Sequence, residues 1–196
     1  MTKIIQADPT QWFPMPAMLV TCASPEGKPN VMSIGYVGFC CWDPPIISLG
    51  INESRYTRAI LAQTGELVVN VPDADSIVAM DYCGFVSGVT VDKFAASGLT
   101  PVPATKVQAP LIAECPVNLE CRVNTIIELG SHHLIIAKVL VTHVGSDVID
   151  DSTKLMPVIL MSRFYTGGLR RLHPFGVSGG RPPEDVHYIK PEGERS

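Results

Sequence analysis

The 196-residue sequence predicts a mainly β fold, in which the strands close into a β-barrel and short helices are inserted between them. One observation is that about six or seven segments have the apolar runs of strands and are bounded by turn-forming residues. The other is that the segments with helical spacing are short. Antiparallel strands of this kind avoid open edges by closing into a barrel.

The first half of the chain supplies four of the predicted strands. Turn-forming residues separate them, with Pro25-Glu26-Gly27-Lys28 after the first strand and Asp43-Pro44-Pro45 before the third. Pro72 stops the fourth strand. The four predicted strands are residues 17–22, 30–37, 46–51 and 66–71.

A helix is predicted between the third and fourth of these strands, over residues 54–64. Ser54 is expected to cap its start, because its hydroxyl can accept a hydrogen bond from an unpaired first-turn amide. Tyr56 and Ile60 give the helix an apolar side at helical spacing. Gly65 suits the left-handed conformation that ends a helix.

Two more helices are predicted in the middle of the chain. Asp73 or Asp75 is expected to cap a second helix that ends near Gly84. Residues 92–97 predict a short helical turn that Gly98 closes.

The second half of the chain returns to strands. A Pro-punctuated loop over residues 101–110 leads into two long strands, residues 117–129 and 132–144, joined tightly at Gly130-Ser131. A last strand is predicted at residues 157–164, and the tail from residue 173 is rich in Gly, Pro and charge. We therefore expect one domain over residues 1–172 and an extended tail over residues 173–196.

The composition excludes several classes of function. Hydrophobic residues make up 46% of the chain and charged residues only 17%, so we expect self-association to cover part of the surface. The net charge is −4 and no basic stripe is present, which excludes a nucleic-acid partner. No segment reaches the roughly 18 apolar residues of a membrane span, and residues 1–13 do not resemble a signal peptide. A cytoplasmic protein is expected.

The six cysteines do not form a metal-binding pattern. They lie at positions 22, 40, 41, 83, 115 and 121, and none is arranged as CxxC. The spacing of Cys115 and Cys121 from His132 or His133 is too loose for a zinc signature. Free thiols are therefore expected, most of them buried, with no metal site.

The common catalytic motifs are absent from the sequence. No GxGxxG follows a strand, and there is no GxxxxGK[ST], GxSxG or HExxH. Ser, His and Asp all occur, but no pattern in the sequence assembles them into a triad.

Arg55 and Thr57 form a weaker constellation in the first turn of the first predicted helix. Exposed amides and the helix dipole favour an anion there, and a guanidinium with a hydroxyl would complete a phosphate site. The simpler alternative is a capped helix with a solvated arginine, and from composition alone that alternative is favoured.

Four other residues have the same two interpretations. Lys93 is either a solvated charge or a ligand-binding cation, and His132 either begins a strand or serves a site. Tyr36 and Tyr165 would ordinarily be core or rim aromatics. None of them identifies a function alone.

Taken together, five stretches resemble the flavin reductase-like, FMN-binding split-barrel family, most closely its flavoredoxin branch. The resemblance covers residues 14–169, and the order and spacing of the stretches carry it. They are PNVMSIGYVGFCCWDPP (29–45), INESRYTRAILAQTGELVVNV (51–71), SGVTVDKF (87–94), NLECRV (118–123) and LGSHHLIIAKV (129–139).

This resemblance implies an FMN-binding split barrel, a homodimer, and FMN bound near the dimer interface. It assigns a flavin contact to Asn30 and places Thr57 beside the phosphate with Arg55 close by. It also assigns Lys93 of the DKF motif and His132 of the LG-x-H motif to the cofactor site. An aromatic residue expected after the last strand falls on Tyr165 or Phe164.

The flavin needs an apolar slot, amides at its pyrimidine edge and a cationic end for its phosphate. Backbone around Ser33 and residues 48–51 is expected to supply the amides. Tyr36 stands at a position where flavoredoxins share a Trp. FMN binding is still expected with Tyr at this position, but the particular activity stays open.

Taken with this resemblance, strand periodicity predicts that Tyr36 lies against or beside the flavin ring and not in the general core. Residues an even number apart share one face of a strand, so an unbroken strand would point Asn30 and Tyr36 to the same side. Met32 and Ile34 would lie there too, as an apolar floor beneath the flavin. Gly35 on the opposite face would let the backbone approach another segment.

Three functions are consistent with the sequence. The first is an NAD(P)H-dependent flavin reductase, and the second is an FMN electron carrier without nicotinamide chemistry. The third is a non-redox binding module on the same barrel, because one fold hosts several functions. A redox partner protein or a small-molecule acceptor would receive the electrons.

Overall fold

The computed structural model describes residues 3–5, 15–73, 75–146, 163–166 and 171–174 of the 196-residue chain. Side chains are described for these ranges except 163–166 and 171–174. No helix in the described part of the chain is long and apolar enough to cross a membrane.

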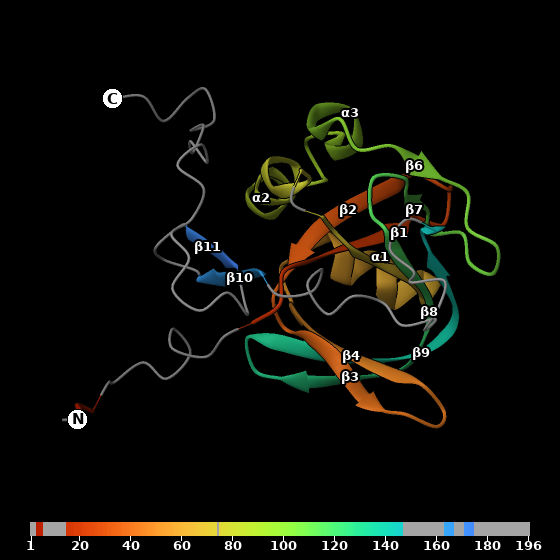
Figure 1. Ribbon diagram of the computed structural model, residues 1–196. Coiled ribbons are helices and arrows are strands. Elements are labelled where there is room, and N and C mark those ends of the chain that lie inside the picture. The colour runs from red at the N-terminus through yellow and green to blue at the C-terminus, as the bar shows by residue number, and fades with distance from the viewer. Residues whose placement is uncertain (1–2, 6–14, 74, 147–162, 167–170, 175–196) are drawn as a thin grey trace.

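A curled, seven-stranded antiparallel sheet forms most of the molecule (Figure 1). The order of strands across it is β2-β1-β5-β8-β9-β4-β3, and β8 and β9 form the longest hairpin. The predicted mainly β fold is confirmed. The strands are β1 (Met18–Ala23), β2 (Pro29–Ile34), β3 (Val37–Cys41), β4 (Ile46–Asn52), β5 (Glu66–Val71), β8 (Val117–Leu129) and β9 (His132–Val144).

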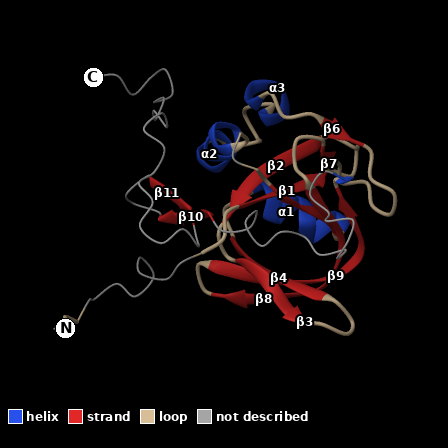
Figure 2. Ribbon diagram, in the orientation of Figure 1, coloured by secondary structure: helices blue, strands red, loops and turns tan. Residues whose placement is uncertain are grey.

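Three short helices accompany the sheet. Helix α1 (Tyr56–Thr64) lies inside the curl of the strands, where Ile60 and Leu61 join the main core (Figure 2). Helices α2 (Ile77–Phe85) and α3 (Lys93–Ser97) pack beside β2 and enclose a second core cluster. The remaining elements are the short strand pairs β6 (Pro101–Val102) with β7 (Leu111–Ile112), and β10 (Arg163–Thr166) with β11 (Arg171–Pro174).

Most of the predicted elements are confirmed, several at the predicted residues. Strands β5, β8 and β9 have the bounds that the sequence predicts. Gly65, Gly98 and Gly130 have φ angles of 65°, 76° and 75°, so each takes the left-handed conformation that its turn requires.

The predicted strand over residues 30–37 is wrong in one important respect. Strand β2 ends at Ile34, the chain bends at Gly35 and Tyr36, and β3 begins at Val37. The physical reason is a change of partner, since β2 pairs with β1 and β3 pairs with β4. The Gly50 amide donates a 2.8 Å hydrogen bond to the Tyr36 carbonyl, which ties the bend to β4.

Two predicted helix caps also differ in the structure. Arg55, not Ser54, is the N-cap of α1, and the Ser54 hydroxyl instead donates to the Asn52 side chain at 2.7 Å. Asp73 accepts hydrogen bonds from the amide and the hydroxyl of Ser76. It therefore orders the turn before α2, because Ser76 stands at the N-cap.

The end of the chain is only partly described. Residues 157–162 of the predicted last strand and residues 175–196 of the predicted tail lie outside the described residues. The predicted domain boundary at residues 172–173 stays a prediction.

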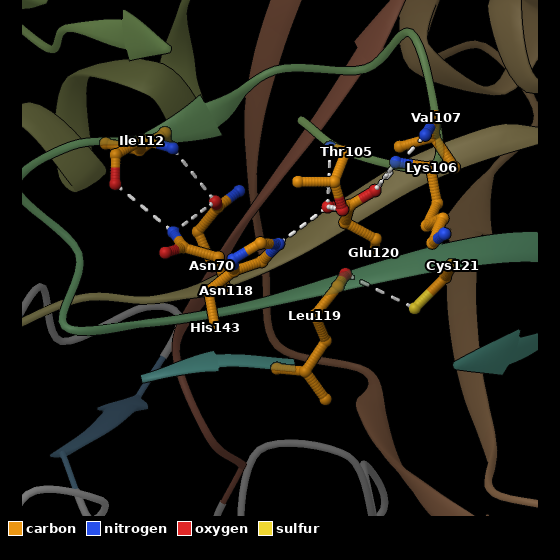
Figure 3. A network of polar contacts seen from close by, with 10 residues as sticks. All are labelled: Asn70, Thr105, Lys106, Val107, Ile112, Asn118, Leu119, Glu120, Cys121 and His143. Carbon is orange, nitrogen blue, oxygen red and sulfur yellow. Dashed lines mark hydrogen bonds and ion pairs between the residues drawn. The ribbon is translucent and has the colours of Figure 1, made fainter. Parts of the chain in front are cut away.

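A buried carboxylate holds the loop between β6 and β7 against the sheet. Glu120 of β8 is fully buried and accepts hydrogen bonds from the amides of Thr105, Lys106 and Val107 (Figure 3). His143 of β9 lies 2.6 Å from the same carboxylate. Burial alone would raise the pKa of Glu120, but these hydrogen bonds outweigh it and lower the pKa to about 2.

Candidate functional site

Five of the predicted site residues line one cavity of about 160 Å³. It lies between β2, the start of α1 and the segment that joins α2 to α3. Asn30 and Ser33 come from β2, Thr57 from α1 and Lys93 from α3, while Arg55 is the α1 N-cap. The structure thus brings together residues that are up to 63 positions apart, Asn30 and Lys93.

The start of α1 presents donors to this cavity. Arg55 has extended backbone and makes no capping hydrogen bond with its side chain, and the first turn contains no acidic residue. The amides of Tyr56 and Thr57 make no hydrogen bond with the described residues. Unpaired amides at a helix N-terminus favour an anion.

Two cationic side chains reinforce this preference. Arg55 donates to the Gly84 carbonyl at 3.3 Å, and Lys93, only 6% exposed, donates to the Cys83 carbonyl at 2.9 Å. Burial lowers the pKa of Lys93 from its ordinary value, and the nearby charge of Arg55 lowers it further. No described carboxylate lines the cavity. Both cations would be stabilised by a bound anion.

Buried hydrogen bonds hold the floor of the cavity. The Asn30 side chain donates to the Thr57 hydroxyl at 2.8 Å and to the Cys22 sulfur at 3.7 Å. Asn30 is 4% exposed and Thr57 is 2% exposed. Asn30 therefore joins β2 to the first turn of α1.

The segment after α2 approaches this floor closely. A Cβ atom at Gly88 would overlap the Oδ1 atom of Asn30. Only glycine allows the backbone to pass so near the amide. Val86, Ser87 and Gly88 line the cavity together.

A second cavity of about 300 Å³ adjoins the first and shares Ser33, Arg55 and Gly84 with it. The Ser33 hydroxyl donates to the Met80 carbonyl. Asp81 also contributes to the lining. Most of the other lining residues are apolar or small: Ala17, Ile34, Gly35, Met80 and Phe85. A polar, cationic cavity thus opens beside a more apolar one.

Comparison with known proteins decides the family. The flavin reductase like domain matches residues 10–169, which is most of the chain. The chain belongs to the flavin reductase-like family.

Individual proteins resemble this chain in sequence or in structure. An uncharacterized protein of Archaeoglobus fulgidus is 38% identical over 117 residues, which are 59% of this chain and 66% of that protein. The flavoredoxin of Desulfovibrio vulgaris (Miyazaki F) superposes with a TM-score of 0.81 at 27% identity, over 94% of this chain and 99% of that one. The flavoredoxin of Methanosarcina acetivorans has a TM-score of 0.79 at 26% identity, over 94% of this chain and 97% of that one.

Tyr36 and His132 of this flavin reductase-like chain contact each other. Their rings meet edge to face, with centroids 5.4 Å apart and planes at 83°. Neither residue lines either cavity. The predicted unbroken strand from Asn30 to Tyr36 is wrong, because β2 ends at Ile34 and the chain bends at Gly35 and Tyr36. Strand periodicity therefore gives no argument for the direction of the Tyr36 side chain. The predicted roles of Tyr36 and His132 as flavin contacts stay predictions.

Tyr165 and Phe164 belong to β10, and their side chains lie outside the described residues. Sequence reasoning also missed several residues that line the polar cavity: Ser54, Gly84, Ser87 and Gly88. The SGVTVDKF stretch contained two of them, but only its lysine was assigned to the site.

The described cysteines are all free. Cys40 and Cys41 are exposed on β3, while the others are buried. Burial raises the pKa of Cys22 to about 11 and the pKa values of Cys115 and Cys121 to about 12, which makes these thiols poor nucleophiles. Within the described ranges, no group of His, Cys, Asp or Glu is arranged to hold a metal ion.

Proposed function

We propose that this flavin reductase-like protein binds FMN and transfers electrons through it. The observation that carries the proposal is the pair of cations, Arg55 and Lys93, beside the unpaired amides of α1 in a cavity without a described carboxylate. A phosphate supplies the missing negative charge. The flavoredoxins that share the fold support the same cofactor class.

The polar cavity would hold the phosphate and the adjoining cavity would hold the ring system. Arg55 and Lys93 would contribute charge-assisted hydrogen bonds, and the amides of Tyr56 and Thr57 would bind phosphate oxygens. Ala17, Ile34, Met80 and Phe85 would exclude water around the ring. When bound, the flavin supplies the redox chemistry, accepting and donating one or two electrons.

We propose NADH or NADPH as the electron donor, which would make the protein an oxidoreductase. The family supports this donor, and the absence of a dinucleotide-binding fingerprint is compatible with direct contact between nicotinamide and flavin. The second candidate is an FMN electron carrier without nicotinamide chemistry, which the likeness to flavoredoxins favours. The acceptor is then a redox partner protein or a small molecule.

We also propose a cytoplasmic homodimer. Several large apolar side chains are exposed on β3, on β8 and in the turns beside β3: Tyr36, Phe39, Trp42, Ile127 and Leu129. Exposed apolar groups of this kind favour burial against a second copy. The exposed thiols of Cys40 and Cys41 are typical of a reducing compartment.

Binding of FMN and of riboflavin distinguishes the phosphate site from a general flavin site. Riboflavin lacks the phosphate, so Arg55→Ala should weaken FMN binding by at least about tenfold and leave riboflavin binding nearly unchanged. Arg122→Ala is a matched control, because Arg122 is an exposed arginine that pairs with Glu66 away from the cavity. Equal losses for both ligands would show that Arg55 does not bind phosphate.

Anaerobic addition of NADH or NADPH then separates the two redox functions. Rapid bleaching of the bound flavin absorbance supports the reductase. A bound flavin that only a chemical reductant bleaches supports the carrier. A protein that stays colourless with added FMN would contradict both and favour the non-redox module.

A further inference from the structure

A third cavity, of about 500 Å³, lies on the other side of the start of α1. It is formed by the loop before α1, by α1 itself and by the turn between β8 and β9. Ser54 lines both this cavity and the polar cavity of the proposed flavin site. The charged residues around it have no role in the proposed FMN site.

His133 forms the floor of this cavity and its ring is held in one tautomer. The residue is 4% exposed, and its Nδ1 atom lies 3.1 Å from Nε of Arg58. The Arg58 Nε–H group can only donate, so Nδ1 accepts and the neutral ring carries its proton on Nε2. That Nε2–H group makes no hydrogen bond with the described residues and lies 4.0 Å from the Glu53 carboxylate.

This tautomer excludes His133 as a metal ligand while Arg58 stays in place. A histidine that binds a metal through Nε2 needs the proton on Nδ1, where it is donated to an acceptor. The Arg58 guanidinium offers no acceptor. The cavity therefore presents a hydrogen-bond donor, the Nε2–H group, at the surface of an otherwise buried side chain.

Charged groups of both signs surround this donor. The terminal nitrogens of Arg58 and the carboxylates of Glu53 and Glu128 make no hydrogen bond with the described residues. Arg58 is half-buried beside His133, whereas Glu53 and Glu128 are exposed. Donors thus lie at the floor and acceptors lie at the rim.

We propose that this cavity is a second ligand site, for a zwitterion of the α-amino-acid class. The ligand's carboxylate would accept hydrogen bonds from His133 and Arg58, and its ammonium group would lie between Glu53 and Glu128. The net charge of the lining is −1, from one arginine and two glutamates with a neutral histidine. A lining of net charge −1 favours a ligand of net charge zero or +1, and it repels an anion such as free phosphate or a nucleotide.

Glycine is the smallest probe with both charged groups, and acetate and methylammonium carry one group each. In ¹H–¹⁵N NMR titrations of the full chain, glycine should shift the amides around residues 53–54 and 128–133 saturably, with Kd on the order of 1 mM. Acetate and methylammonium should each bind at least about tenfold more weakly. Either half binding as tightly as glycine would overturn the proposal, as would the absence of saturable shifts with glycine.

Charge reversal at the rim gives a second test on an exposed position that folding should tolerate. Glu128→Lys should weaken glycine binding at least about tenfold and strengthen acetate binding, because the ammonium partner is replaced by a cation. Glu26→Gln, in the distant β1–β2 turn, should leave both affinities unchanged. Unchanged glycine affinity in Glu128→Lys would overturn the proposal.

Discussion

Glu120 should make the stability of this protein depend on pH in a specific way. Its pKa lies at about 2 in the folded protein against an ordinary value of 4.5. A pKa that is lower by about 2.5 corresponds to about 3 kcal/mol of stabilisation at neutral pH, at about 1.4 kcal/mol for each pKa unit. Because the folded pKa is the lower one, this stabilisation is present above about pH 4.5 and is lost as the pH falls toward about 2.

Replacing the carboxylate by an amide removes that contribution. Glu120→Gln keeps the size of the side chain but turns an NH₂ group toward amide donors of residues 105–107. Urea unfolding should show a loss of about 3 kcal/mol at pH 7. The difference between wild type and variant should shrink by about 2 kcal/mol on going to pH 3, where part of the wild-type contribution has already been lost.

Glu128→Gln is the matched control, because Glu128 is exposed and makes no hydrogen bond with the described residues. Its free energy of unfolding should stay close to that of wild type at both pH values. A Glu120→Gln loss below about 1 kcal/mol, or a loss of the same size at pH 7 and pH 3, would refute the reasoning.

Three other predictions concern the site and the thiols. Gly88→Ala should weaken FMN binding by at least about tenfold, because the added methyl group displaces Asn30. Gly38→Ala is the control and should leave FMN binding unchanged, because Gly38 has open space around it. An equal effect of the two substitutions would contradict the close approach of Gly88 to Asn30. Tyr36→Trp should keep FMN bound but shift its visible spectrum or midpoint potential, and an unchanged spectrum and potential would place Tyr36 away from the ring. Chelator and reductant together should leave the melting temperature nearly unchanged, whereas unfolding would reveal a missed metal or disulfide.

Local patterns predicted much of the fold. Gly65, Gly98 and Gly130 mark chain reversals that need positive φ. β5 begins directly after Gly65, β8 ends directly before Gly130, and β9 begins two residues after Gly130. These features depend on neighbouring residues, so a single sequence contains them. The family resemblance added Asn30 and favoured the binding-site interpretation of Thr57 and Lys93, and the structure brings all three to one cavity.

Features that depend on distant partners were not predictable in the same way. The bend at Gly35 and Tyr36 exists because β3 pairs with β4 and not with β1. Glu120 looks like a solvent-facing charge in a strand, and only the loop that covers it makes it a buried acceptor. His133 is distinguished from His132 by Arg58, which lies 75 residues away along the chain.

The central claim is that the start of α1, with Arg55 and Lys93, binds the phosphate of FMN. Equilibrium titration of the purified protein with FMN and with riboflavin, followed by flavin fluorescence, tests it most directly. The account predicts an FMN Kd at or below about 1 μM and riboflavin binding that is weaker by at least about tenfold. Equal affinity for the two flavins, or no saturable change with FMN, would contradict it.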